Sequence, residues 1–386
     1  MIPYGKQEIN QADIDAVIGV LKSDFLTQGP QVPLFEQSIQ DATQSKHAIA
    51  VNSATSALHI ACLALGVTRG DVVWTTPITF VASANCALYC GAEIDFVDIN
   101  AQTYNLCADK LEKKLSHARK NNLPLPKVVI PVHLCGQPCE MDKIYSLSLE
   151  YGFSIIEDAS HAIGGKYRDE PIGNCEYSDI TIFSFHPVKI VTTAEGGVAT
   201  TNNSNLAQKM ALLRSHGITR DSSIMTEESH GGWYYQQIEL GFNYRMTEMQ
   251  AALGVSQMTR LHSFVAKRNQ LAERYDEYLK ELPITTPYQI KECYSGRHLY
   301  VIRLQLEAIS LTHKEVFEAL RKNNIGVNLH YIPVHTQPYY KKLGFKQGVF
   351  IEAEKYYQEA ISIPLFHTMT LEQQDTVSNT LKSILK

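Results

Sequence analysis

Cysteine is scarce in this sequence, with eight residues among 386 and no metal-binding spacing. This low content excludes a disulfide scaffold, which needs many cysteines in a short chain. Cys135 and Cys139 flank a Gly-Gln-Pro segment, but no second pair of cysteines or histidines lies nearby. We therefore interpret both as structural thiols and expect no bound metal.

Long apolar runs and dense basic clusters are also missing. No run reaches membrane-spanning length, and the start, Met1–Lys6, lacks the basic and apolar parts of a signal peptide. Lysine and arginine total 35 against 40 aspartates and glutamates, a net charge of −5, and the basic residues between Lys110 and Lys120 fit a solvated helix face. These absences argue against nucleic-acid and membrane partners and predict a cytoplasmic protein.

A third absence concerns nucleotide motifs and repeats. No Gly-x-Gly-x-x-Gly segment follows an early strand, which argues against a nicotinamide-dependent oxidoreductase. No repeat of solenoid period is present either. What remains is a chain that is 44% apolar and long enough for about two domains.

Short apolar runs alternate with helical segments through most of the chain. This alternation predicts an α/β fold whose mainly parallel sheet is covered by helices on both faces. The expected strands are 48–51, 72–75, 94–97, 128–132, 155–157, 180–183 and 197–200, with helices over 54–65 and 82–89. In such sheets, ligands bind at the carboxyl ends of the strands.

A long charged helix is predicted over 259–282, directly before Pro283. We interpret it as the bridge between a large domain, 1–260, and a smaller C-terminal α+β domain, 261–386. The polar segment 219–237 predicts a surface loop of the kind that often borders active sites.

The smaller domain shows one strand and two helix starts. The strand is expected over 300–305. Each helix start has the pattern of a capping box, in which the first and fourth residues bond reciprocally. The two pairs are Thr312 with Glu315 and Thr370 with Gln373.

Two charged residues lie among apolar ones. Asp158 follows an apolar run at a strand's carboxyl end, where a carboxylate is unfavourable unless it meets a positive group such as a protonated pyridine nitrogen. Lys189 is surrounded by small and apolar residues, and desolvation there favours the neutral amine needed for Schiff-base chemistry. Taken alone, Asp158 fits a helix cap equally well, and Lys189 fits a surface lysine better.

The segment 52–58, between a strand and an Ala-rich helix, is a candidate anion site. Its free N–H groups, the helix dipole and the hydroxyls of Thr55 and Ser56 favour a phosphate, and Ser184 offers another hydroxyl. An ordinary serine N-cap fits this segment as well.

The order of these groups along the chain is more informative than any one of them: a phosphate turn, Phe80 after a strand, then the aspartate and the lysine. Pyridoxal 5′-phosphate (PLP) is held by such a set, with phosphate anchored, ring stacked, ring nitrogen paired and aldehyde bound to lysine.

Six motifs carry a family resemblance that runs nearly end to end. The chain resembles the sugar aminotransferases of the DegT/DnrJ/EryC1/StrS group, which are fold-type I PLP-dependent transferases. The motifs are Thr-Pro-Ile-Thr-Phe at 76–80, Glu-Asp-Ala-Ser-His-Ala at 157–162, Phe-Ser-Phe-His-Pro-Val-Lys at 183–189, Glu-Gly-Gly at 195–197, Arg-Ser-His-Gly at 214–217 and Gly-Phe-Asn-Tyr-Arg-Met at 241–246.

The resemblance implies a role for each matching position. Lys189 is implied to hold PLP as a Schiff base and to serve as general acid and base, and Asp158 to pair with the pyridine nitrogen. Asn243 is implied to reach the neighbouring subunit's active site, so the resemblance predicts a homodimer. The other implied cofactor contacts are Phe80 on the ring, His161 near O3′ where many members have glutamine, and Thr55, Ser56 and Ser184 on the phosphate.

Three segments, 26–29, 52–58 and 185–197, are most similar to family members of pseudaminic acid biosynthesis. Those members use L-glutamate to aminate C4 of a UDP-linked 4-keto-6-deoxy-N-acetylhexosamine. Other members aminate other nucleotide-linked 4-keto sugars, which is the alternative. The nucleotide-sugar contacts implied are Tyr4, Leu26, Thr27, Gln28, Gly29, Ser56, Ser184, Asn243, Asn328, Leu329, His330 and Tyr331.

Two further alternatives fit the sequence less well. A PLP-dependent sugar dehydratase of this fold has histidine where Lys189 stands. A non-catalytic PLP-binding regulator typically carries an appended DNA-reading domain, and this chain has no room for one beyond the fold.

Overall fold

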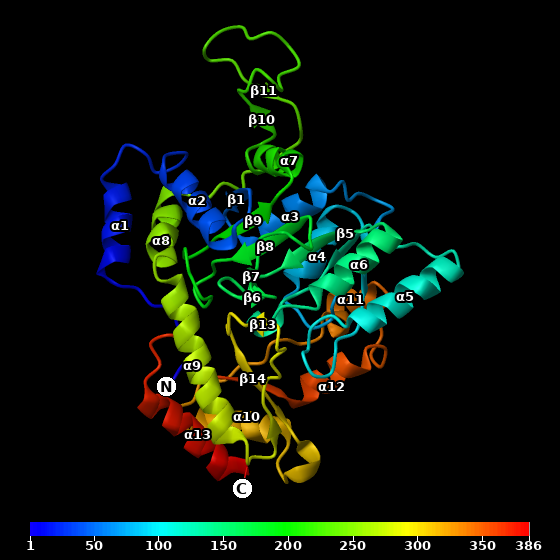
Figure 1. Cartoon of the computed structure of the whole chain (residues 1–386), viewed down its shortest axis with the longest axis vertical. Coiled ribbons are helices and arrows are strands. Elements are labelled where there is room, and N and C mark those ends of the chain that lie inside the picture. Colours follow the sequence, from blue (N-terminus) through cyan, green and yellow to red (C-terminus); the bar gives the residue numbers. More distant parts are fainter. Residues whose placement is uncertain (386) are drawn as a thin grey trace.

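The computed structural model describes residues 1–385, and a seven-stranded sheet in the order β1-β9-β8-β5-β4-β2-β3 forms its centre (Figure 1). All neighbouring strands are parallel except that β9 runs against both β1 and β8. No helix lies between β8 and β9, and without a crossover the returning strand runs antiparallel. The expected mainly parallel sheet is confirmed. Its strands are β1 His47–Val51, β2 Val72–Thr75, β3 Glu93–Phe96, β4 Val128–Ile130, β5 Ser154–Asp158, β8 Ile180–Ser184 and β9 Gly197–Thr201.

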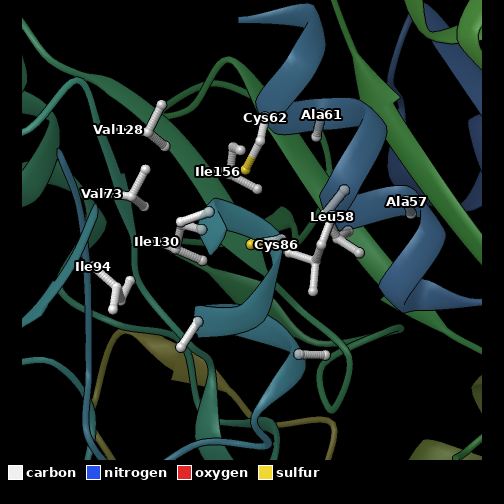
Figure 2. Close-up of a cluster of buried hydrophobic side chains, with 14 of the residues drawn as sticks. Ala57, Leu58, Ala61, Cys62, Val73, Cys86, Ile94, Val128, Ile130 and Ile156 are labelled. Carbon is white, nitrogen blue, oxygen red and sulfur yellow. The ribbon is translucent and has the colours of Figure 1, made fainter. Parts of the chain in front are cut away.

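Alternate strand residues pack against helices on opposite faces of the sheet. Val128 and Ile130 face α3 (Ala54–Ala64) and α4 (Ala82–Tyr89), in the cluster drawn in Figure 2. Val129 faces the other side, which is covered by α2 (Gln31–Thr43), α5 (Ala108–Lys120), α6 (Met141–Tyr151) and α8 (Glu248–Met258). Because both faces are buried, the strands are continuous apolar runs in the sequence.

The C-terminal part forms a second core beneath the sheet in Figure 1. The helix expected over 259–282 is present as α9 and spans Leu261–Leu279. It begins later than expected because a turn at Thr259 and Arg260 separates it from α8. Both expected capping boxes form, at Thr312 and at Thr370. The other elements of this core are the antiparallel strands β12 (Ile284–Thr285), β14 (Tyr300–Leu304) and β15 (Ala360–Ile363), with α10 (His313–Lys322) and α13 (Leu371–Leu385). The helices α11 (Pro338–Lys342) and α12 (Ile351–Glu359) pack instead in the cluster that contains α3 and α4.

The N-terminal segment lies against this C-terminal core. Ile2 pairs with Ile325 as a parallel bridge, and the Leu365 N–H donates to the Tyr4 carbonyl. The helix α1 (Gln11–Leu21) then packs against α8. The start of the chain therefore contacts both the C-terminal core and the helices beside the sheet.

The polar segment 219–237 forms an arm at the top of Figure 1. Its base is a short antiparallel pair, β10 (Ile218–Thr219) with β11 (Gln236–Gln237), which follows α7 (Ser204–Arg214). Trp233 is 75% exposed on this arm. A separate small sheet contains β6 (Lys166–Tyr167), β7 (Glu170–Pro171) and β13 (Cys293–Tyr294). Across residues 1–385, none of the helices is both long and apolar enough to cross a membrane.

Candidate active site

A cavity of about 470 Å³ opens where the parallel strands end and α3 begins. Strand ends and helix starts meet here because the parallel strands all point toward the same edge of the sheet. The residues that line it include nine of the predicted site residues, namely Tyr4, Thr55, Phe80, Asp158, His161, Ser184, Lys189, His330 and Tyr331.

Asp158 is the last residue of β5 and is 4% exposed. Its carboxylate accepts hydrogen bonds from the Ser83 hydroxyl, at 2.6 Å, and from the Ser160 backbone N–H, at 3.1 Å. No cationic side chain in residues 1–385 forms an ion pair with it. A buried carboxylate with only neutral donors on the protein side is suited to a cationic group in the cavity.

Lys189 enters the same cavity from the turn that follows β8. The turn is held by hydrogen bonds from the Lys189 N–H to the His186 carbonyl and from the Thr193 N–H to the Phe185 carbonyl. Burial lowers the pKa of Lys189 to about 8, with a smaller opposing contribution from Asp158. A substantial fraction of the amine is therefore neutral, and nucleophilic, near physiological pH.

The anion end of the cavity is the first turn of α3. Ser53 is the N-cap, with its hydroxyl accepting from the Ser56 N–H. Thr55 and Ser184 line the cavity, whereas the Ser56 hydroxyl donates to Asn52 Oδ1 inside the turn, at 2.7 Å. The turn thus presents backbone N–H groups and the Thr55 hydroxyl to a phosphate, while Ser56 stabilises the turn.

Gly197 is the first residue of β9 and packs against the start of α3. A Cβ at this position would lie 2.4 Å from the Ala54 nitrogen and 2.5 Å from the Ser53 carbonyl carbon. The start of β9 therefore packs directly beneath the anion turn, which only glycine permits.

His161 is buried and forms a chain of contacts at the back of the cavity. Its Nδ1 accepts from the Cys135 N–H, at 3.2 Å, and its Nε2 lies 3.2 Å from the Tyr331 hydroxyl. Burial, with Lys189 and His330 nearby, lowers the pKa of His161 well below its usual range. The ring is therefore neutral, with its proton on Nε2 facing Tyr331, which leaves the Tyr331 hydroxyl free to donate into the cavity.

Phe80 lies in the cavity wall with 58% of its surface exposed. This exposure leaves ring surface available for stacking against a bound ring, and the nearby Tyr331 ring is tilted, with its centroid 6.2 Å away. Tyr4 and His330 lie on the same side, with ring centroids 5.4 Å apart.

Eight predicted residues do not line this cavity in a single chain. They are Leu26, Thr27, Gln28, Gly29, Ser56, Asn243, Asn328 and Leu329. Gln28 and Gly29 line a separate depression beside Arg245. Asn243 is bridged to Ser215, and Asn328 to Ser362. The fold of a single chain does not bring Leu26–Gly29 and Asn243 to Lys189.

Several lining residues were not predicted from the sequence, namely Ser53, Ser160, His186, Glu195 and His298, together with Ser83 on Asp158. Ser83 lies 75 residues before Asp158, and nothing in the local sequence marks that contact. His298, from the C-terminal part of the chain, contacts His161, with ring centroids 4.4 Å apart and the ring planes tilted by 47°. Ser53, Ser160, His186 and Glu195 lie within segments that the sequence analysis singled out as candidate site motifs, whereas Ser83 and His298 lie in none of them.

This set of groups defines a class of protein. One cavity holds an amine with a depressed pKa, a carboxylate that lacks a cation, an exposed aromatic ring and a helix N-terminus. These groups fit the aldehyde, the pyridinium nitrogen, the ring face and the phosphate of PLP. When bound, PLP supplies an electron-accepting ring for reactions at a substrate's amine-bearing carbon. The fold and the cavity are those of a PLP-dependent transferase.

Comparison with known proteins gives the family. The model of the DegT/DnrJ/EryC1/StrS aminotransferase family matches residues 7–382, and the chain belongs to this family. It is 39% identical to the UDP-4-amino-4,6-dideoxy-N-acetyl-beta-L-altrosamine transaminase of Campylobacter jejuni subsp. jejuni serotype O:2, covering 100% of this chain and 98% of that protein.

Solved structures agree with this assignment. Helicobacter pylori PseC, an aminotransferase involved in the biosynthesis of pseudoaminic acid, has a TM-score of 0.90 and 31% identity, covering 100% of this chain and 99% of that one. The PLP form of the putative sugar aminotransferase Spr1654 from Streptococcus pneumoniae has a TM-score of 0.88 and 29% identity, covering 99% and 98%. The chain is an aminotransferase with PLP as its cofactor, as predicted.

Proposed function

We propose that this enzyme transfers the amino group of L-glutamate to C4 of a UDP-linked 4-keto-6-deoxy-N-acetylhexosamine. The product would be UDP-4-amino-4,6-dideoxy-N-acetyl-β-L-altrosamine, the sugar that names the 39% identical Campylobacter jejuni relative. The observation that supports this most is full-length similarity to that relative combined with a cavity that holds Lys189 and Asp158 together. The cytoplasmic location expected from the sequence belongs to the same proposal.

We also propose roles for the residues in the cavity. Lys189 would hold the cofactor through its amine, and the same amine would move the proton at the substrate carbon, because burial lowers its pKa to about 8. Asp158 holds the proton on the pyridine nitrogen. Phe80 stacks on the ring, and His161 orients Tyr331 toward the reacting groups through the 3.2 Å contact.

In this proposal, the cofactor and the nucleotide sugar bind in different parts of the cavity. Thr55, Ser184 and the N–H groups at the start of α3 bind the cofactor phosphate. Tyr4 and His330, on the side of the N-terminal segment, contact the nucleotide sugar. Both groups lie in one cavity, so cofactor and sugar can be bound next to each other.

The predicted homodimer accounts for the residues that one chain leaves apart. Leu26–Gly29 and Asn243 do not line the Lys189 cavity in a single chain, although the Asn243 carbonyl accepts from the Asn52 side chain at the anion turn. We propose that a second copy brings Asn243 and Leu26–Gly29 to the cavity. The exposed arm at 219–237, which precedes Asn243, is placed to lie against that copy.

A panel of substrates tests the proposal. Purified enzyme is incubated with L-glutamate and UDP- or dTDP-linked 4-keto sugars of both C5 configurations, and products are identified by mass spectrometry and NMR. We expect efficient amination at C4 of UDP-2-acetamido-2,6-dideoxy-β-L-arabino-hex-4-ulose. Preference for another 4-keto sugar would support the alternative family substrate. Conversion of the cofactor by glutamate without amination of any sugar would favour a PLP-binding protein that does not act on sugars.

A further inference from the structure

Two neutral hydroxyl groups from a distant part of the chain lead to the Asp158 carboxylate. The Ser83 hydroxyl donates to Oδ2 of Asp158 at 2.6 Å, and the Thr79 hydroxyl lies 2.8 Å from the Ser83 oxygen. Thr79 is 2% exposed, Ser83 0% and Asp158 4%. The three side chains therefore form one buried chain of hydrogen bonds that ends on the carboxylate.

The number of protons available fixes the direction of this chain. An ionised carboxylate only accepts hydrogen bonds, so the single hydroxyl proton of Ser83 points to Asp158. The Phe80 carbonyl is a second acceptor for Ser83, but it lies farther away, at 3.3 Å. Because the Ser83 proton is directed to Asp158, the Thr79 hydroxyl is the donor in the contact between the two hydroxyls. Thr79 thus polarises Ser83, which strengthens the bond from Ser83 to the charged group.

An ordinary role within its own helix does not account for the Ser83 hydroxyl. Ser83 lies in the first turn of α4, where a serine side chain often bonds to the nearby backbone. The N-cap of this helix is Val81, which makes no side-chain cap hydrogen bond. The shortest contact of the Ser83 hydroxyl instead leaves the helix and reaches the end of β5. This hydroxyl is therefore directed at the active site.

Different elements fix the backbone and the side chain of Asp158. Its N–H donates to the Pro131 carbonyl and its carbonyl accepts from the His133 N–H, so the sheet fixes the backbone. The terminal torsion of an aspartate is soft, and the sheet alone does not orient the carboxylate. The Ser83 hydroxyl on Oδ2 and the Ser160 N–H on Oδ1 fix the carboxylate plane. Each oxygen keeps a lone pair for a group in the cavity.

We propose that Ser83 and Thr79 are positioning residues that hold Asp158 charged and oriented, so that Asp158 keeps a proton on the pyridine nitrogen of PLP. This inference rests on the role proposed above for Asp158. Hydrogen bonds to a carboxylate favour its charged form over its protonated form. Without the Ser83 hydroxyl, the buried carboxylate competes more strongly for the proton, and the pyridine nitrogen is neutral more often.

The protonation of the cofactor nitrogen tests this proposal directly. The enzyme is loaded with PLP that carries nitrogen-15 in its ring, and the chemical shift of that nitrogen is measured by NMR. We expect the wild-type signal in the protonated range and the Ser83→Ala signal shifted toward the neutral range. The glutamate half-reaction should also slow about tenfold in Ser83→Ala, which is the scale of a hydrogen bond to a charged group. A Ser83→Ala signal at the wild-type position would overturn the proposal.

Three further variants separate positioning from folding. Thr79→Val should shift the nitrogen signal in the same direction by a smaller amount, whereas Thr79→Ser, which keeps the hydroxyl, should stay at the wild-type position. Thr75→Val is the matched control, because the buried Thr75 hydroxyl donates to the Ile130 carbonyl, at 2.7 Å, and not to a carboxylate. It should lower Tm as Ser83→Ala does but leave the signal and the rate unchanged. An equal shift in Thr75→Val would contradict the positioning role.

Asp158→Asn distinguishes this proposal from the function on which it rests. An asparagine carries no charge to stabilise a protonated nitrogen, so the signal of this variant should lie in the neutral range. If its nitrogen stays protonated, the role proposed for Asp158 is wrong, and this proposal is wrong with it. If Asp158→Asn shifts the signal and Ser83→Ala does not, Asp158 keeps its role and only the positioning by Ser83 and Thr79 is rejected. Neither result depends on which sugar the enzyme aminates.

Discussion

At the scale of single residues, burial of the Lys189 amine affects both its reactivity and the stability of the protein. Burial lowers the pKa of Lys189 from 10.5 to about 8. The folded protein without cofactor therefore binds this proton less tightly than the unfolded chain does, and folding is opposed most strongly below pH 8. The property that makes the amine nucleophilic also destabilises the empty protein.

Replacing Lys189 with methionine should raise the free energy of unfolding of the cofactor-free protein at pH 7. The expected gain is about 1–3 kcal/mol, because each pKa unit corresponds to about 1.4 kcal/mol. The gain should shrink as the pH rises from 8 toward 10.5, where the wild-type amine becomes neutral in both states. Urea unfolding at pH 7 and pH 10 measures this difference.

The exposed Lys113→Met is the control for that experiment, and it should change stability by less than about 0.5 kcal/mol at either pH. A Lys189→Met protein that is less stable than wild type at pH 7 would show that the amine is paired or solvated. In either case Lys189→Met should lose all turnover, since no other lysine lines the cavity among residues 1–385.

At the scale of elements, the contact between β9 and the start of α3 determines the phosphate turn. Gly197→Ala would place a Cβ 2.4 Å from the Ala54 nitrogen and displace the turn. We expect PLP to bind at least ten times more weakly, a difference of about 1.4 kcal/mol. Equilibrium dialysis of the cofactor measures it. Gly19→Ala on α1, where a Cβ meets nothing within 4 Å, should bind PLP as wild type does.

A buried carboxylate fixes α1 on α8. Asp13 is 0% exposed and accepts from Arg260, from the Ser256 hydroxyl at 2.6 Å and from Gln257 at 2.8 Å. Burial raises the pKa of Asp13, but these hydrogen bonds outweigh it, and the pKa is lowered overall. The carboxylate therefore stabilises the fold above its unfolded pKa near 3.8, and this contribution is lost as the pH falls through the lower folded value.

Asp13→Ala should lower the free energy of unfolding by about 3–5 kcal/mol at pH 7, because Arg260 loses a buried partner. The difference from wild type should narrow below pH 4. Asp15→Ala is the matched control on the same helix, since Asp15 is exposed and bonded only to Gln11 across one turn. Denaturant titration compares the two. An equal loss of stability in both variants would mean that the substitutions act through the helicity of α1 and that the Asp13 contacts do not contribute.

At the scale of the whole molecule, the proposed dimer predicts that subunits complement each other. Lys189→Ala and Asn243→Ala should each be inactive alone. After the two are mixed, unfolded and refolded together, mixed dimers contain one cavity with both wild-type residues, so part of the activity should return. Activity assays on purified mixed dimers measure this, with refolded single variants as controls. No recovery in a verified mixed dimer would place Asn243 in the active site of its own chain.

The sequence alone specified most of the sheet and nine of the residues that line the cavity. Strand and helix positions followed from apolar runs and capping pairs, because these are short-range properties. Asp158 and Lys189 were predicted to share a site, since both follow strands that end at the same edge of a parallel sheet. The resemblance to a known family then supplied PLP, the reaction class and the role of each matching residue.

Tertiary structure decided what depends on distant contacts. The hydrogen bond from Ser83 to Asp158, the contact of His298 with His161 and the pairing of Ile2 with Ile325 join segments that no local pattern connects. The same holds for the amine of Lys189, whose pKa falls because the fold encloses it. Burial and long-range contact are properties of the packed chain, so the sequence determined which groups are present and the fold determined what each one can do.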